Sequence, residues 1–431
     1  MKYLSILIIA FLTQSNHAPA QDTWFEQPSG TSSSLYSVYF LDENSGWIGG
    51  SDNVLKKSTN GGNSWENTAF HGSQTSKWYC IYFVSSSYGY AAGSVYNYDR
   101  WQSNWARTSN GGSSWEWQTS WGNEYSSTQS LFFLNENTGW KVGPRNGDGM
   151  LYKTTSGISG WYSLPSLPEP MYSVWFTDAQ NGWCAGSYGA IYATTNGGSG
   201  WVSLNSDSTI SFKSVCFIDL SKGWVVGYGN NQAVILKTVN GGQTWDTVFP
   251  STIKELHSVV FVDKNTGWAC GKMESTPTDK GVILGTTNGG TNWEVQHVND
   301  NCSVFYALHF INNSVGWAVG SNGIIAKTTT GGLTDVKDIN KLTPADYSLL
   351  QNYPNPFNPA TIIKYTIPEK TWATLTVYNI LGRKVAGLLN GETAPGYHQV
   401  EFNGSNLASG IYFYRLAAGS FTQIKKMILI K

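Results

Sequence analysis

The chain has 431 residues, enough for two or three domains, and its formal net charge of −1 conceals an uneven distribution. Residues 22–334 hold 16 Lys and Arg against 22 Asp and Glu, whereas residues 335–431 hold 10 against 6. The long acidic part shows no basic stripe, so the sequence argues against nucleic-acid binding. Aromatic residues make up 14% of the chain, with 47 Gly and 20 Trp, and charged residues only 13%. This composition is typical of short strands joined by tight turns.

The first 20 residues have the pattern of a secretory signal peptide. Lys2 precedes an apolar run, Leu4 to Leu12, and Ala18-Pro19-Ala20 forms a small-residue cleavage site. The apolar run is too short to cross a bilayer as a stable helix, although a membrane anchor is the alternative. We therefore expect the mature chain to begin at Gln21, without a transmembrane segment.

A repeat built on a Gly-Trp or Gly-Tyr pair dominates residues 21–334. Successive pairs lie 41 to 50 residues apart, the period of a four-stranded propeller blade. The seven pairs are Gly46-Trp47, Gly89-Tyr90, Gly139-Trp140, Gly182-Trp183, Gly223-Trp224, Gly267-Trp268 and Gly316-Trp317.

Four strands, a to d, can be assigned within each copy. Strand a is an apolar segment such as SVYF or SVWF, followed by an Asp- or Asn-containing turn and a Gly before strand b. Strand c leads into a box such as TNGGNSW, in which Asn-Gly-Gly suits a turn with positive φ at successive positions. The Trp that opens strand d can fold over this turn.

The seventh copy lacks the Trp of this box, since Leu333-Thr334-Asp335 follows Gly331-Gly332. The segment from Thr23 to Pro28 instead resembles the strand-d stretch TWDTVFP. We therefore predict that an N-terminal strand containing Trp24 completes blade seven, and that ring closure protects the sheet edges. The expected fold is all-β: a seven-bladed β-propeller closed by an N-terminal strand.

The turn motif DxxxGW together with KTxNGGxxW resembles the photosystem II stability/assembly factor propellers. It is also similar to the BNR/Asp-box repeats of sialidases and related glycosidases. This resemblance covers roughly residues 24–334 and implies the fold, because the shared residues belong to turns and core. A role in photosystem assembly is not expected to carry over. Residues 22–334 contain only three arginines, Arg100, Arg107 and Arg145, which are poor material for a sialidase-type arginine cluster.

Residues 335–346 have the polar character of a linker, and residues 347–431 are predicted to form a small β-sandwich. Four segments closely resemble the C-terminal sorting domain of the type IX (Por) secretion system: Asn355–Pro359, Val377–Gly382, Leu407–Tyr412 and Lys425–Lys431. The resemblance implies passage through the periplasm, the secretion machinery as a partner, and a location that is extracellular or on the outer cell surface.

The sequence shows no catalytic, metal or cofactor motif, so none is predicted. The five cysteines have the pattern of small buried residues, and no two histidines lie at metal-ligand spacing. Acidic residues that could lie on the rim of the b–c and d–a loops are spread over four blades, and solvated loop charge is the favoured interpretation: Asp52, Asp99, Asp148, Glu274 and Asp279.

Blade two departs most from the repeat, through a long b–c insertion and an aromatic d–a loop. Aromatic platforms suit stacking of sugar rings or a protein hot spot, although these rings could instead pack together to hold the loop. The candidate ligand-binding residues are Tyr96, Tyr98, Asp99, Arg100, Trp101, Trp105 and Trp121. The sequence thus favours a secreted binding module for a polysaccharide or a surface protein. The alternative is a glycoside hydrolase of the Asp-box superfamily.

Overall fold

The computed structural model describes residues 23–68, 75–97, 99–119, 125–205, 208–248, 250, 252–275, 277–332, 347–352 and 355–430. The predicted signal peptide and linker lie outside these residues. The chain divides into two compact units, Met1–Thr334 and Asp335–Lys431. Two short 3-10 helices, η1 (Gly157–Gly160) and η2 (Ser321–Gly323), interrupt the strands, and the described residues contain no α-helix. The all-β prediction is confirmed.

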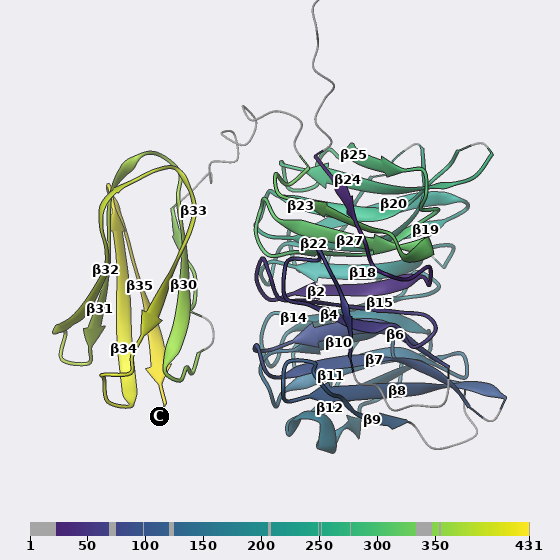
Figure 1. The fold of residues 1–431 in the computed structure, drawn as a ribbon, viewed down its shortest axis with the longest axis horizontal. Helices are drawn as coiled ribbons and strands as arrows, with labels where there is room; N and C mark the ends of the chain where they lie inside the picture. The colour runs from purple at the N-terminus through teal and green to yellow at the C-terminus, as the bar shows by residue number, and fades with distance from the viewer. Residues whose placement is uncertain are drawn as a thin grey trace, which may run out of the picture. The chain divides into compact units, whose positions relative to one another are not determined.

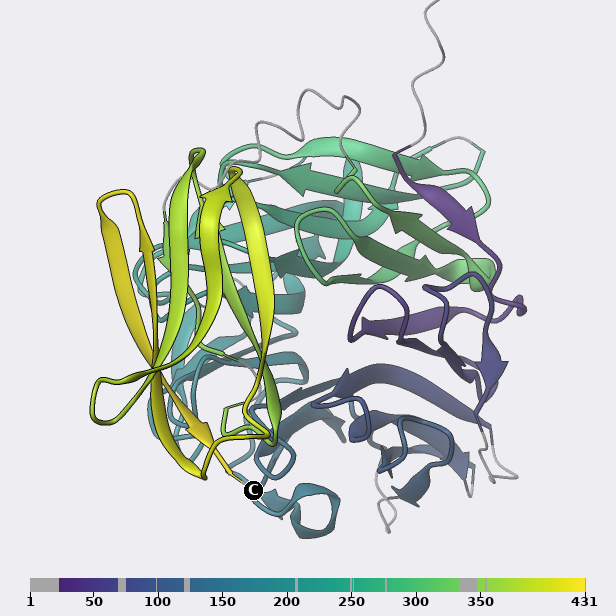
Figure 2. The same ribbon diagram turned by 60° about the vertical axis from the view of Figure 1, so that its left-hand side comes forward.

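The first unit is a ring of seven four-stranded antiparallel sheets (Figures 1 and 2). Blade one comprises β2 (Leu35–Phe40), β3 (Gly46–Gly50), β4 (Leu55–Ser58) and β5 (Glu66–Asn67). Blade two comprises β6 (Ser76–Phe83), β7 (Gly89–Asn97), β8 (Arg100–Thr108) and β9 (Glu116–Thr119). Blade three comprises β10 (Ser130–Phe133), β11 (Gly139–Arg145), β12 (Asp148–Thr154) and β13 (Tyr162–Ser163).

The remaining blades repeat the same strand order. Blade four comprises β14 (Met171–Phe176), β15 (Gly182–Gly186), β16 (Ile191–Thr194) and β17 (Val202–Asn205). Blade five comprises β18 (Ser211–Phe217), β19 (Gly223–Gly229), β20 (Gln232–Thr238) and β21 (Asp246–Val248). Blade six comprises β22 (Ile253–Phe261), β23 (Gly267–Met273), β24 (Lys280–Thr286) and β25 (Glu294–Asn299). Blade seven comprises β26 (Phe305–Phe310), β27 (Gly316–Gly320), β28 (Ile325–Thr328) and β1 (Phe25–Gln27).

The N-terminal strand β1 closes the ring as predicted. It pairs antiparallel with β28, so that Phe25 lies opposite Lys327. Trp24 is only 1% exposed and meets Phe310 edge-on, with ring centroids 5.7 Å apart. The box Trp of each of the other six blades meets the last Phe of its own strand a in the same geometry. Trp24 therefore supplies the ring that the seventh box lacks.

The strand-b aromatic residues join each blade to the next. Trp47 stacks on Phe83 of blade two, with ring centroids 3.5 Å apart, and its indole N–H donates to the carbonyl of Gly111 at 3.2 Å. Trp317 makes the equivalent contacts to Phe40 and Gly61, which joins blade seven to blade one. Six interfaces thus combine buried aromatic area with a satisfied indole donor, and at the interface between blades two and three the Tyr90 hydroxyl donates instead, to the carbonyl of Glu136 at 2.6 Å.

Backbone conformation and close packing explain why glycine occupies two parts of the repeat, the Asn-Gly-Gly turn and the position before the strand-b Trp. Gly61 and Gly62 have φ of 71° and 89°, the left-handed conformation expected for the Asn-Gly-Gly turn. Gly46, before the strand-b Trp, has no room for a side chain, because a Cβ would lie 2.3 Å from the ring of Phe40.

In each blade, the residue four positions before the strand-a Phe lies in the wall of the central opening. This inner ring consists of Tyr36, Tyr79, Gln129, Tyr172, Lys213, His257 and Tyr306, all of which line one cavity of about 270 Å³. His309 does not belong to this ring. Its imidazole packs on Tyr39 of blade one, with ring centroids 4.5 Å apart, as expected for an inter-blade packing residue. It donates to the carbonyl of Phe40 at 2.8 Å, and burial lowers its pKa to about 4, so it is neutral.

The second unit is a small β-sandwich of two antiparallel sheets. The three-stranded sheet comprises β29 (Ser348–Leu349), β30 (Ala360–Ile367) and β33 (Gly396–Asn403). The four-stranded sheet, in spatial order, comprises β32 (Lys384–Thr393), β31 (Thr371–Asn379), β34 (Gly410–Ala418) and β35 (Phe421–Leu429). Both sheets contribute to one buried core, which includes Ile363, Leu375 and Tyr414.

Candidate functional site

The long hairpin of blade two, β7–β8, carries most of the predicted site residues. Its register pairs Tyr96 with Trp101 and Asn97 with Arg100, and Asp99 in the turn has a positive φ of 61°. The backbone N–H of Ser126 donates to the carbonyl of Trp101 at 3.1 Å. This bond joins the b–c hairpin to the d–a segment that leads into blade three, so both lie on one rim.

The predicted residues fall into two groups. Tyr96, 44% exposed, packs on Trp101 with ring centroids 5.4 Å apart. The Arg100 guanidinium lies 5.8 Å from the ring centroid of Tyr125. Trp105 lies in a different cavity, against blade three. Tyr98 and Trp121 are outside the described residues.

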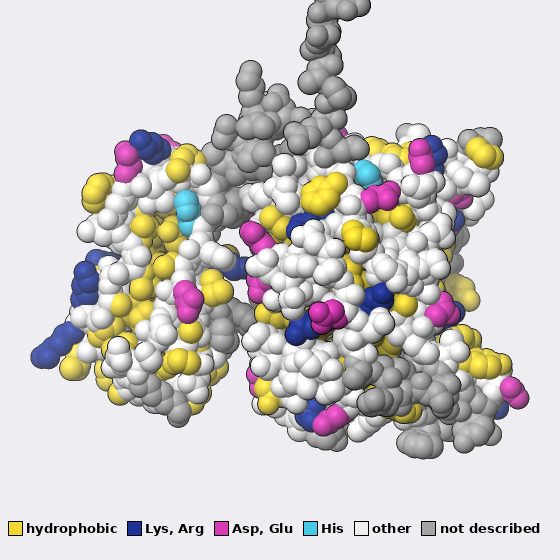
Figure 3. All heavy atoms as spheres, in the orientation of Figure 1, with side chains coloured by type: hydrophobic (Ala, Val, Ile, Leu, Met, Phe, Trp, Pro, Cys, Tyr) yellow, Lys and Arg dark blue, Asp and Glu magenta, His cyan; other side chains and the backbone are white. Residues whose placement is uncertain are grey.

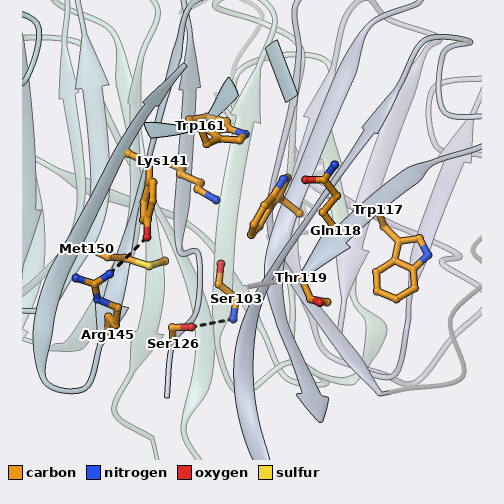
Figure 4. Close-up of a pocket in the computed structure, with 11 residues that line it drawn as sticks. Ser103, Trp117, Gln118, Thr119, Ser126, Lys141, Arg145, Met150 and Trp161 are labelled. Carbon is orange, nitrogen blue, oxygen red and sulfur yellow. Dashed lines mark hydrogen bonds between the residues drawn. The ribbon is translucent and has the colours of Figure 1, made fainter. Parts of the chain in front are cut away.

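Two cavities flank the boundary between blades two and three. The middle cavity, about 690 Å³, is lined by Trp101, Lys77 and Tyr79 among others. The Lys77 amine lies 4.5 Å from the Trp101 ring centroid. The outer cavity, about 710 Å³, is lined by Ser103, Trp105, Trp117, Gln118, Thr119, Ser126, Lys141, Arg145, Met150, Tyr152 and Trp161 (Figure 4).

Lys141 on β11 is the unusual residue of the outer cavity. Its side chain is 2% exposed, and its amine points into the cavity (Figure 4). The nitrogen lies 3.3 Å from the ring centroid of Trp105, 4.9 Å from that of Tyr152 and 5.1 Å from that of Trp161. The amine thus occupies an aromatic box that stabilises a cation through the ring faces.

No described Asp or Glu lines this cavity to balance the charge of Lys141. Burial lowers its pKa to about 7, and burial also raises the pKa of the nearby Cys80 thiol, which is therefore neutral. Among the described residues, Lys141 has no ion pair or hydrogen-bond partner. Arg145, four residues along the same strand, adds a second cation and donates to the Tyr152 hydroxyl at 3.4 Å. The cavity is therefore suited to an anionic group.

The sequence contained a signal for Lys141 that our interpretation did not use. In the other six copies, the residue after the strand-b aromatic is apolar, as core packing requires: Ile48, Ala91, Cys184, Val225, Ala269 and Ala318. Trp117, Tyr152 and Trp161 belong to different segments of blades two and three, and only the contact between these blades brings them to one cavity.

The three cavities adjoin one another in a row. Tyr79 lines both the inner-ring cavity and the middle cavity, and Ser126 lines both the middle and the outer cavities. We call this row the blade-two groove. It contains Lys77, Lys141, Lys213 and Arg145, and among the residues that the structure describes no Asp or Glu lines it. On the face shown in Figure 3, by contrast, charged side chains of both signs are scattered over the propeller.

None of the five predicted rim acids lines the blade-two groove. Asp52 accepts hydrogen bonds from Ser33 and Ser51, both at 2.8 Å, and these bonds lower its pKa. Glu274 and Asp279 pair with Lys254 at 3.5 and 3.1 Å. Asp99 and Asp148 are exposed. No described group of His, Cys, Asp and Glu is arranged to hold a metal ion, and no described helix is long and apolar enough to span a membrane.

Two family matches divide the chain as its two units do. Residues 161–295 match the family described as photosynthesis system II assembly factor YCF48. Residues 351–431 match the secretion system C-terminal sorting domain, which indicates sorting by the type IX secretion system. Both resemblances predicted from the sequence are confirmed. No curated protein matches the chain.

The solved structures with similar folds are β-propellers. YCF48 bound to D1 peptide is 16% identical, with a TM-score of 0.56, and the match covers 72% of this chain and 98% of that one. YCF48 from Cyanidioschyzon merolae is 17% identical, with a TM-score of 0.53 and coverage of 71% and 98%. The GH74 enzyme of Niastella koreensis is 13% identical, with a TM-score of 0.54 and coverage of 80% and 59%. At these identities the likeness shows the fold alone.

Proposed function

We propose that this chain is a non-catalytic binding module, exported to the cell surface or the medium, whose propeller binds an acidic polysaccharide along the blade-two groove. The observation that carries the proposal is the buried amine of Lys141, which faces a cavity lined by aromatic rings and by no acid of the described part of the chain. A carboxylate on a sugar would form an ion pair with the Lys141 ammonium group. The faces of Trp105 and its neighbours would pack on the sugar rings.

The net charge of the propeller supports an anionic ligand with a specific docking site. Residues 22–334 carry six more acidic than basic residues, so the propeller as a whole repels polyanions. Four cations nevertheless line the groove. Recognition would then depend on the groove and not on bulk charge.

The groove gives little support to glycoside hydrolysis. That reaction needs two carboxylates placed on either side of one glycosidic bond, and no described Asp or Glu lines the groove. Glu255 and Asp279 do approach each other, since both lie near the Lys272 amine, at 2.5 and 3.9 Å. Hydrogen bonds from His257 and Lys272 lower the pKa of Glu255 to about 2, which is opposite to what a general acid requires.

Replacing Trp105 tests the binding site. We expect Trp105→Ala to weaken binding of polygalacturonate or alginate by the full-length mature protein about 10-fold or more, as for a central aromatic contact. Trp105→Phe, which keeps an aromatic face, should retain most of the affinity. Titration calorimetry would measure both, with uncharged xyloglucan as a comparison ligand.

The matched control is Trp372→Ala, which removes an exposed Trp from the second unit. Its affinity should equal that of the wild type. Equal affinities of Trp105→Ala and the wild type, or equal binding of xyloglucan and the acidic polymers, would contradict the proposal.

Removal of residues 347–431 tests export. In cells that have the type IX system, we expect the shortened protein to remain in the periplasm, because the sorting unit is missing. Fractionation and surface labelling would locate it, and full-length Trp105→Ala serves as an exported control. Appearance of the shortened protein at the cell surface would show that this unit is not the sorting signal.

A further inference from the structure

The inner ring differs from other repeated positions because its residues diverge between blades. Four blades contribute tyrosine, whereas Lys213 comes from blade five and His257 from blade six. A position that serves the fold alone would repeat one residue type, as the strand-a Phe does in all seven blades. Among the residues that differ from tyrosine, Lys213 adds a cation to the wall of the central opening.

Lys213 is a cation without a direct anionic partner among the described residues. Its amine lies 3.7 Å from the ring centroid of Tyr172 and 5.3 Å from that of Tyr228. Burial lowers its pKa to about 8, so it is mostly charged at neutral pH. Glu255 is the acid that influences it, but that carboxylate is engaged by His257 at 3.0 Å and by Lys272.

The tyrosines of the inner ring are placed as hydrogen-bond donors. The Tyr172 hydroxyl accepts from Ser187 at 2.9 Å and the Tyr79 hydroxyl from Ser94 at 3.5 Å, which leaves their own protons free. Burial raises the pKa of Tyr36 to about 12 and also raises the pKa of Tyr306, so these phenols stay protonated. One ammonium group among several O–H donors forms a suitable site for a carboxylate.

The inner ring also forms one end of the blade-two groove. Tyr79 connects it to the middle cavity, and Ser126 connects the middle cavity to the cavity of Lys141. Cations therefore occur at the inner end, in the middle and at the outer end of the groove. A chain with a carboxylate on successive units would meet a cation in each cavity.

We infer that the inner ring is an end-binding subsite, which holds the terminal carboxylated sugar of a polyuronate chain whose following sugars occupy the groove between blades two and three. The inference rests on the proposed function and adds to it the ligand class and the orientation. The inner cavity, about 270 Å³, is smaller than the other two and is lined by residues from all seven blades, so a chain that lies in the groove meets the far wall of the ring there and would place its end in this cavity.

Oligogalacturonates of one to ten units test the inference by titration calorimetry with the full-length mature protein. End binding predicts that the affinity per chain rises with length and becomes constant once the groove is filled. Binding to interior stretches predicts an affinity per chain that keeps rising, because longer chains offer more sites. A continued rise would overturn the inference.

A substitution at the inner ring gives the second readout. We expect Lys213→Met to weaken binding of short and long chains by about 10-fold to 100-fold, the loss of one charged hydrogen bond, and Lys213→Arg to retain most of the affinity. Lys222→Met, which removes a charge from the a–b turn of the same blade, is the control. Wild-type affinity of Lys213→Met, together with weakened binding by Trp105→Ala, would overturn this inference and leave the proposed function intact. Absence of uronate binding by the wild type would reject both.

Discussion

Trp24→Ala lowers the free energy of unfolding of the propeller by about 3–5 kcal/mol, the usual cost of truncating a buried aromatic residue. The ring of Trp24 is almost fully buried against Phe310, and it precedes the strand that completes blade seven. Gln27 on that strand donates to the carbonyl of Gly61 in blade one at 3.1 Å. Loss of Trp24 therefore weakens both a core contact and the junction between the first and last blades. Denaturant unfolding of the full-length protein, followed by near-ultraviolet circular dichroism, measures the change.

Phe25→Ala is the matched control for Trp24→Ala, since the neighbouring Phe25 is exposed. Its effect should stay within about 0.5 kcal/mol, as for surface substitutions. Equal shifts of the unfolding midpoint for the two variants would show that Trp24 does not hold the ring closed. A change in the denaturant dependence for Trp24→Ala alone would indicate that blade seven opens before the rest.

The fold could be predicted from the sequence because its determinants are local and repeated seven times. The Gly-Trp pair, the strand-a Phe and the Asn-Gly-Gly turn recur in the same order along the chain. The strands assigned in one copy could therefore be transferred to the next. Closure by Trp24 followed from the one box without a Trp. The bond from a strand-b Trp to the turn of the next blade could not be predicted, because it joins residues that lie 57 to 65 positions apart within the series.

The candidate site was predicted less completely, because it is built across a blade boundary. The blade-two insertion indicated the region where Trp101 and Trp105 both line cavities. The prediction of one platform depended on these residues being close in sequence. In the structure they serve different cavities, and the partners of Trp105 come from blade three. Lys141 was visible only as a charged exception at an apolar position of the repeat.

Lys141→Met is expected to have opposite effects on binding and on stability. Burial lowers the pKa of Lys141 from its usual value of 10.5 to about 7, which corresponds to a destabilisation of about 5 kcal/mol at low pH. Methionine fills a similar volume without a charge, so the variant should unfold at a higher denaturant concentration. Affinity for polygalacturonate should fall about 10-fold to 100-fold, because a buried charge-assisted contact is lost.

The pH dependence separates the effect of the charge from that of packing. The folded protein binds the Lys141 proton more weakly than the unfolded chain, so the stability of the wild type rises with pH between about 7 and 10.5. The stability gained by Lys141→Met should therefore be largest below pH 7 and shrink above it. Polyuronate binding requires the charged amine, so the affinity of the wild type should fall as the pH rises through about 7, whereas the variant lacks this step.

Lys57→Met, which removes a charge from strand β4 of blade one, is the control for net charge. It should change neither the affinity nor its pH dependence. A buried lysine that lowers the free energy of unfolding and contributes to binding is an example of the trade-off between stability and function. If Lys141→Met gained stability but bound polyuronate as tightly as the wild type, with the same pH dependence, the amine would not be the anion-binding group. Groove recognition would then depend on the remaining cations.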